Sequence, residues 1–308
     1  MILLDRIAAG LRALRHPPDR GVHVPRLAGY EPGALTRTVA GRRGRIVAVD
    51  TRLHLHDRAF AALSESRATV KEQMGRSPDA PGSPAHVPPS GVPRYWSIGY
   101  SAGFALDRLA EAIEEFVEQT EALDRIRQAA EDAMRRRDPQ HAAGRPARGV
   151  ADVGERYGTA LSDLAWLVCL GAGRAQIGRY LACTGAAGQD ALFDRIVVRL
   201  GFERPVADEL VDPTAYADAL ELLDAPAGDR PAHLHRLMRR WLRRTHRDVA
   251  ADKPHDIGYV GYWASDLALL ALLWEVDDAG FRDHPHYPRE LADHARVHAW
   301  RGAPTPAS

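Results

Sequence analysis

The sequence predicts an all-α fold, a helical bundle-like protein of two packed helical subdomains with an irregular N-terminal arm. Apolar residues recur at helical spacing over most of the chain. No alternating run of β-branched residues is long enough to predict a strand. The segment from about Trp263 to Trp274 is nearly all Ala, Leu and Trp. A helix that is apolar on every side has to be wrapped by other helices, which favours a bundle.

Composition sets the class of protein. The chain has 308 residues, of which 45% are apolar, enough for a sizeable core. Its 41 basic residues balance 41 acidic ones, so no overall attraction to nucleic acid or membrane is expected. The two cysteines, Cys169 and Cys183, predict a reduced, cytoplasmic setting without a disulfide framework. Charges at Asp5 and Arg6 interrupt the apolar start too early for a signal peptide.

The N-terminal half divides by composition. Residues 1–47 are rich in Gly, Pro and Arg and predict a basic, irregular arm. Residues 48–137 predict the N-terminal helical domain, which begins with a helix over 48–75. Six prolines among Ser, Gly and Ala predict a loop over 76–93.

A long acidic helix is expected from about Leu106 to Arg136, after a tight connector at Tyr100–Phe104. At 100° per residue its apolar residues fall on one side and its acids on the other. The acids are Asp107, Glu111, Glu114, Glu115, Glu118 and Glu121. Such a face is either ordinary solvated surface or an acidic docking strip. For the docking strip, the candidate partner-binding residues are Glu111, Glu114, Glu115 and Glu118.

The C-terminal half repeats the helical pattern. A basic linker over 138–151 precedes a C-terminal helical domain over 152–300, and a tail over 301–308 follows. Gly171-Ala-Gly173 follows an apolar helix rather than a strand, which favours a helix break over a phosphate loop. Further helices are expected over 160–170, 176–182, 190–200, 206–223, 233–247 and 263–274, with Pro213 in the first turn after Asp212.

Histidine–aspartate pairs are the candidates for catalysis. They are His56-Asp57, His255-Asp256 and Asp293-His294, and they suggest a metal-dependent phosphohydrolase of the HD kind as an alternative function. His294 and His298 also have the i,i+4 spacing that can chelate one metal from one helix. No segment gathers three or four ligands, however, and 14 histidines produce such pairs by chance. We therefore predict no catalytic residues, no metal and no cofactor.

An acidic turn follows the apolar helix. Asp277, Asp278 and Asp283 lie in or beside this turn, where the backbone can fix them. Carboxylates on a rigid base can meet a basic groove on a partner at low ordering cost. The local alternative is that they cap the turn or bond to nearby backbone amides. We predict that these three residues bind a partner.

The C-terminal strings of aromatic, acidic and proline residues resemble a known family, the PoNi-type immunity proteins. They are Tyr259-x-Gly261-Tyr262-Trp263, Asp266-x-Ala268, Asp277-Asp278, Phe281-Arg-Asp-His-Pro285 and Tyr287-Pro288-x-x-Leu291. Tyr100-Ser-Ala-Gly103 resembles the N-terminal domain of the family, and Gly188–Leu192 and the helix of Trp241 resemble the approach to its C-terminal domain. Position 266 is Asp where the family pattern leads us to expect Glu.

The resemblance implies a two-part helical inhibitor that is not an enzyme. Such a protein would bind a cognate antibacterial DNase toxin in the cytoplasm and occlude its active site. The toxins are polymorphic, and type VI secretion often delivers them in competition between bacteria. The resemblance implies no contact with nucleic acid or membrane, and it leaves open a toxin that is not a nuclease. It also implies a fold-determining role for Tyr259, Gly261, Tyr262, Trp263, Asp266, Tyr287 and Pro288.

Overall fold

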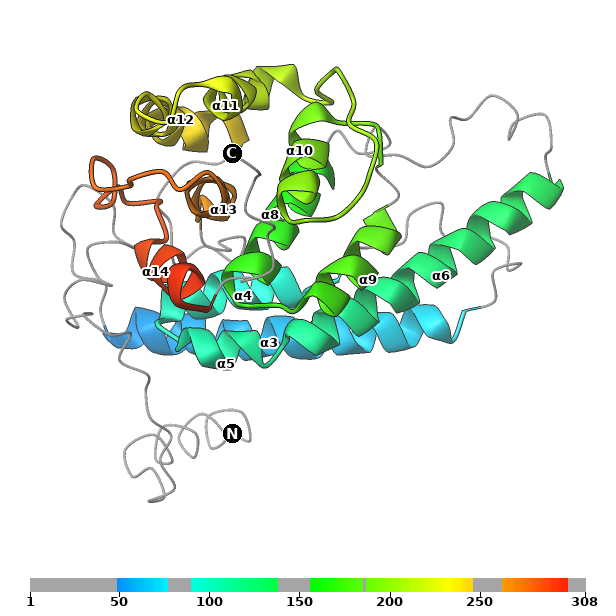
Figure 1. Ribbon diagram of the computed structural model, residues 1–308. Coiled ribbons are helices and arrows are strands. Elements are labelled where there is room, and N and C mark those ends of the chain that lie inside the picture. Colours follow the sequence, from blue (N-terminus) through cyan, green and yellow to red (C-terminus); the bar gives the residue numbers. More distant parts are fainter. Residues whose placement is uncertain (1–48, 77–89, 138–155, 185–186, 246–261, 299–308) are drawn as a thin grey trace.

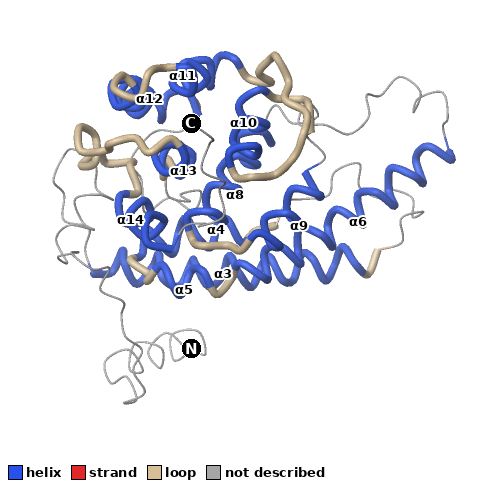
Figure 2. Tube along the Cα trace, viewed as in Figure 1, coloured by secondary structure: helices blue, strands red, loops and turns tan. Residues whose placement is uncertain are grey.

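The computed structural model describes residues 49–76, 90–137, 156–184, 187–245 and 262–298. All secondary structure in these ranges is α-helical, and none of them contains a strand (Figure 2), which confirms the all-α prediction. Other predictions lie outside the described residues: those for the N-terminal arm, the linker, the tail, most of the proline-rich loop, His255-Asp256, Tyr259 and Gly261.

The described residues form the following helices, given in chain order. They are α3 (Val49–Met74), α4 (Val92–Ala102), α5 (Leu106–Ala110), α6 (Ile113–Arg137), α8 (Arg156–Cys169), α9 (Arg174–Thr184), α10 (Ala191–Arg199), α11 (Pro213–Asp224), α12 (Arg230–Thr245), α13 (Ser265–Leu273) and α14 (Arg289–His298). None of the described helices is long and apolar enough to span a bilayer.

The N-terminal helices form a base beneath the rest (Figure 1). Long helices α3 and α6 run side by side, and α4 packs along α3. Helices α8 and α9 stand on this base, α8 against α4 and α9 against α6. Helices α11 and α12 pair at the far side, and α13 packs between them and α8.

Helix α4 corrects the sequence-based expectation of a loop up to residue 93. The helix begins at Val92 because Pro93 occupies its first turn, where a missing amide hydrogen costs nothing. The expected connector is instead the last turn of this helix and its cap. Gly103 has a φ of 84°, and the Phe104 amide donates to the Gly99 carbonyl at 2.9 Å. This left-handed cap favours glycine, because a side chain would be strained there.

The single helix expected from Leu106 to Arg136 is also wrong, because it is broken between α5 and α6. The Leu109 carbonyl would accept from residue 113 in a continuous helix. It accepts instead from the Trp96 indole at 2.9 Å and from the Ala112 amide at 3.2 Å. The buried indole therefore takes the bond that would have joined the two helices, and the chain turns at Glu111.

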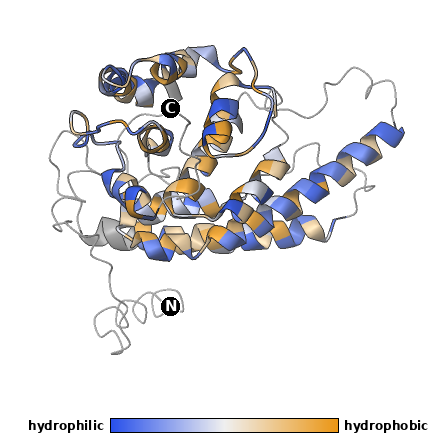
Figure 3. Ribbon diagram, in the orientation of Figure 1, coloured by the Kyte–Doolittle hydropathy of each residue, from blue (hydrophilic) through white to orange (hydrophobic). Residues whose placement is uncertain are grey.

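One continuous hydrophobic core joins the base to the C-terminal helices. It includes residues of every described helix from α3 to α14. The Trp96 and Trp166 rings stack across the boundary with centroids 6.4 Å apart. Helix α13 is apolar all round and buried, as its sequence predicted, and Figure 3 shows it almost wholly hydrophobic. The division into an N-terminal and a C-terminal subdomain stays a prediction.

Candidate partner-binding surface

A contact between two distant sequence motifs supports the candidate surface. The Trp263 indole donates to the Ser101 hydroxyl at 2.8 Å, and its ring meets the Tyr100 ring edge-on at 4.7 Å. The Tyr100 hydroxyl in turn donates to the Glu290 carboxylate at 2.5 Å. Because Trp263 and Tyr100 are both buried, this contact holds the C-terminal motif against the end of α4.

Asp266 is buried in the first turn of α13, close in sequence to Trp263. Its carboxylate accepts from the Trp241 indole at 3.0 and 3.3 Å, so the short side chain still reaches a donor. Burial raises the pKa of Asp266 to about 6, although its hydrogen bonds act in the opposite direction. A small cavity of about 10 Å³, lined among others by Asp266, Trp241 and Tyr216, lies at this position.

Asp278 is buried in the turn between α13 and α14. It accepts hydrogen bonds from Arg282, from Arg296 at 2.8 Å and from the Tyr287 hydroxyl at 2.8 Å. Burial alone would raise the pKa of Asp278, but the bonds and charges of Arg296, Tyr287 and Arg282 outweigh it and lower that pKa. The carboxylate therefore fixes the turn against α14, and we leave it out of the proposed surface.

The other two carboxylates of the turn point outward. Asp277 is exposed and accepts a local bond from the Ala279 amide at 3.0 Å. The Asp283 side chain is 92% exposed, and it pairs with Arg289 at 2.8 Å. His286 closes the turn, since its Nδ1 donates to the Tyr262 carbonyl and its own carbonyl accepts from Ala264. Both carboxylates thus sit on a fixed backbone.

The acidic face of α5 and α6 is partly neutralised by neighbouring helices. Arg67 of α3 forms two hydrogen bonds of 2.7 Å with Glu115. Arg179 of α9 pairs with Glu114 and with Glu121. Glu114 also accepts a hydrogen bond from Gln176, and this bond, followed by the one from Arg179, lowers the pKa of Glu114. The carboxylates at the sides of α6 therefore serve helix packing.

Two acids of this face remain open. Glu111 and Glu118 are exposed, and no described arginine, lysine or histidine forms an ion pair with either. Sequence reasoning treated all four candidate glutamates alike, because their partners Arg67 and Arg179 are 48 and 65 residues away. Partner binding by any of these acids stays a prediction.

The histidine–aspartate pairs do not assemble into a phosphohydrolase site among the described residues. The His56 ring packs against Phe60 and Phe104, at centroid distances of 5.0 and 4.9 Å. Burial, and next the charge of Arg108, lower the pKa of His56. Neither His56 nor Asp57 lies near His294 closely enough to share an ion with it. Burial also raises the pKa of the Cys169 thiol to about 12 and that of Cys183 to about 11, so neither is a ready nucleophile.

Comparison with known proteins agrees with the C-terminal motif. Residues 188–291 match the family model of the C-terminal domain of PoNe immunity proteins (PoNi). This match confirms the resemblance that the motif strings carry. The chain matches no curated protein. The crystal structure of protein PA2201 from Pseudomonas aeruginosa is similar, with a TM-score of 0.51 and 20% identity over 77% of this chain and 78% of that one. At this identity the likeness shows the fold alone.

Proposed function

We propose that this protein is an immunity protein that binds and neutralises a cognate antibacterial DNase toxin in the cytoplasm. The match of residues 188–291 to the C-terminal domain of PoNe immunity proteins is the observation that carries the proposal. The protein would act by binding alone, without catalysis, and its partner would be the toxin rather than nucleic acid or membrane.

The chemistry of a DNase supports an acidic inhibitor surface. An enzyme that holds DNA neutralises phosphates with Lys and Arg, so its active-site groove is basic. Carboxylates on an inhibitor compete with phosphates for those side chains and accelerate encounter. Asp277 and Asp283 suit this role because a buried network fixes the turn that presents them. Glu111 and Glu118 suit it because they have no competing ion pair among the described residues.

Plasmid cleavage by the toxin tests the proposal. The probe is the protein encoded immediately upstream, purified and mixed with supercoiled plasmid and increasing amounts of this protein. We expect cleavage to stop at about one inhibitor per toxin. Reversing charge in Asp277→Lys/Asp283→Lys or in Glu111→Lys/Glu118→Lys should weaken inhibition at least about tenfold, more so at low salt.

A matched variant controls for net charge. Asp208→Lys/Glu221→Lys changes the charge by the same amount at exposed positions outside both acidic regions. This variant should inhibit like the unmodified protein. If the control loses as much inhibition as the other two variants, the effect is one of overall charge and the carboxylates are not in the interface. If the probe cleaves no DNA but is still neutralised in cells, the DNase part of the proposal fails.

A further inference from the structure

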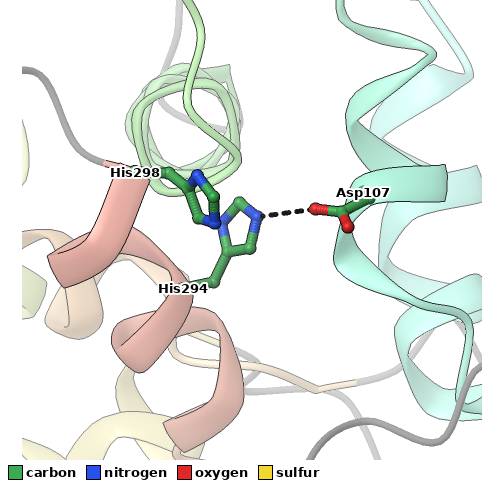
Figure 4. Close-up of side chains that lie close together, drawn as sticks. All are labelled: Asp107, His294 and His298. Carbon is green, nitrogen blue, oxygen red and sulfur yellow. Dashed lines mark hydrogen bonds and ion pairs between the residues drawn. The ribbon is translucent and has the colours of Figure 1, made fainter.

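Three side chains from two distant parts of the chain converge between α5 and α14 (Figure 4). Asp107 comes from the first turn of α5, and His294 and His298 come from the last two turns of α14. One nitrogen or oxygen atom from each lies within 4.8 Å of the others. Asp107 and His294 are 187 residues apart in the sequence, so only the fold brings them together.

His294 is oriented as a metal ligand. Its Nδ1 lies 3.0 Å from the Cys169 carbonyl oxygen, at the end of α8 where helix carbonyls lack intrahelical partners. A carbonyl oxygen can only accept, so Nδ1 carries the hydrogen. The Nε2 atom of the neutral ring then presents its lone pair toward Asp107. Metal-binding histidines in proteins are commonly fixed by the same kind of bond from the second ring nitrogen.

The spacing fits two ligands of one ion better than a hydrogen bond. His294 Nε2 and Asp107 Oδ1 are 3.4 Å apart, beyond the usual hydrogen-bond distance. Two ligand atoms on a tetrahedral Zn²⁺ ion, each with a bond of about 2.0–2.1 Å, are separated by about 3.3 Å. The His298 ring is the next neighbour, with its centroid 4.3 Å from that of His294.

The surroundings suit an ion that enters from solvent. His294 is the fixed member, with only 11% of its side chain exposed, whereas the Asp107 side chain is 88% exposed. His298 is exposed as well, so Asp107 and His298 can both rotate to close on an ion. Three protein ligands on the open side leave a fourth tetrahedral position for water.

We propose that Asp107, His294 and His298 bind a divalent transition-metal ion, with Zn²⁺ as the best match to this ligand set. The ion would tie α5 to α14, and so the N-terminal base to the C-terminal motif. The site departs from the sequence-based expectation that no metal binds. It does not depend on the proposed neutralisation of a toxin.

Metal titration of the full chain, without an affinity tag, tests the site. We expect one Zn²⁺ per chain by calorimetry, a rise in Tm that EDTA reverses, and the visible absorption of tetrahedral Co²⁺ when cobalt is the probe. Asp107→Asn and His298→Ala should each weaken binding at least about tenfold, because even outer-shell changes cost about 10- to 100-fold in metal affinity.

His235→Ala is the matched control, because it removes an exposed histidine from α12, outside the cluster. It should leave metal affinity unchanged. Circular dichroism of the metal-free variants checks that each one folds. The proposal is overturned if the chain binds no Zn²⁺ or Co²⁺ at micromolar concentration, or if Asp107→Asn and His298→Ala bind the ion as tightly as His235→Ala does.

Discussion

Two acidic regions of this protein use their carboxylates in different ways. In the turn between α13 and α14, one aspartate is buried under two arginines and a tyrosine while its neighbours face solvent. Along α5 and α6 none of the four candidate glutamates is buried, and the difference among them is whether an arginine of α3 or α9 reaches them. In the turn, burial determines whether an aspartate stabilises the fold or stays exposed. Along α5 and α6, the same outcome depends on whether an arginine of a neighbouring helix pairs with the glutamate.

The comparison separates acids that hold the fold from acids that are free to bind. A buried carboxylate with several donors cannot leave them without a large cost, whereas a surface ion pair contributes little. Changes at the buried residues of the C-terminal motif should therefore act mainly on stability. Changes on the acidic helix should act mainly on binding. Four predictions test this division.

The largest expected effect is that of Trp263→Ala at the base of the turn. The side chain is 7% exposed and its indole donates to Ser101, so truncation leaves a cavity and removes one hydrogen bond, while the Ser101 hydroxyl keeps its bond to the Ser97 carbonyl. We expect a loss of about 3–5 kcal/mol in the free energy of unfolding. Urea unfolding followed by circular dichroism measures it. A midpoint equal to that of the unmodified protein would mean that the two motifs do not pack.

The pair Asp278→Ala and Asp277→Ala tests the turn itself. Removing Asp278 takes away the buried carboxylate that Arg282 and Arg296 share, although the exposed Asp293 still pairs with both. Both arginines are about one-third exposed, so we expect a loss of about 2–3 kcal/mol, below the range for a fully buried pair. Asp277→Ala should cost less than about 1 kcal/mol, since it loses one exposed turn bond. Equal effects of the two changes on Tm would contradict the conclusion that Asp278, and not Asp277, holds the turn against α14.

The substitution Asp266→Asn tests whether burial of Asp266 makes the stability of the protein depend on pH. The pKa of Asp266 is raised to about 6 in the folded protein, so the folded state binds its proton more tightly than the unfolded state does. The stability from this group is present at low pH and is lost as pH rises toward and through 6. From about pH 4 to about pH 7 the aspartate should cost the protein about 2 kcal/mol that asparagine does not.

The measurement for Asp266 is a difference in Tm between variant and unmodified protein at several pH values. Other groups also contribute to the pH dependence of stability, among them Asp163, whose pKa burial raises well above its ordinary value. The difference cancels them, because they are common to both proteins. We expect the advantage of asparagine to grow with pH. A difference that stays constant would show that Asp266 is ionised at all these pH values.

The smallest expected effect is on the acidic helix. Arg67→Ala breaks the pair with Glu115, in which the arginine side chain is 59% exposed. We expect a loss of about 0.5 kcal/mol, because exposed ion pairs contribute about 0.2–1 kcal/mol. A double-mutant cycle with Glu115→Gln isolates the pair. A coupling free energy above about 2 kcal/mol would mean that this ion pair stabilises the fold as strongly as the buried carboxylate of the turn does.

Local sequence patterns were sufficient for most helices. The spacing of apolar residues located α3, α10 and α12 closely. The expected helix over 206–223 began too early, because α11 starts only at Pro213, where Asp212 caps its first turn. Helix α4 was missed because the prolines before it favoured a loop, although Pro93 was itself the signal of a first helical turn. The break after α5 was missed because it depends on Trp96, a residue of another helix.

The sequence by itself determined the all-helical class, the buried character of α13 and the motif of the C-terminal domain, because each depends on residues that are close along the chain. Only the tertiary structure decided which acids are buried, paired or open, and which histidines meet an aspartate. Arg296 on Asp278, Arg67 on Glu115 and Asp107 beside His294 are contacts across the fold. A charged side chain acts according to its burial and its neighbours, and these are set by packing rather than by position in the sequence.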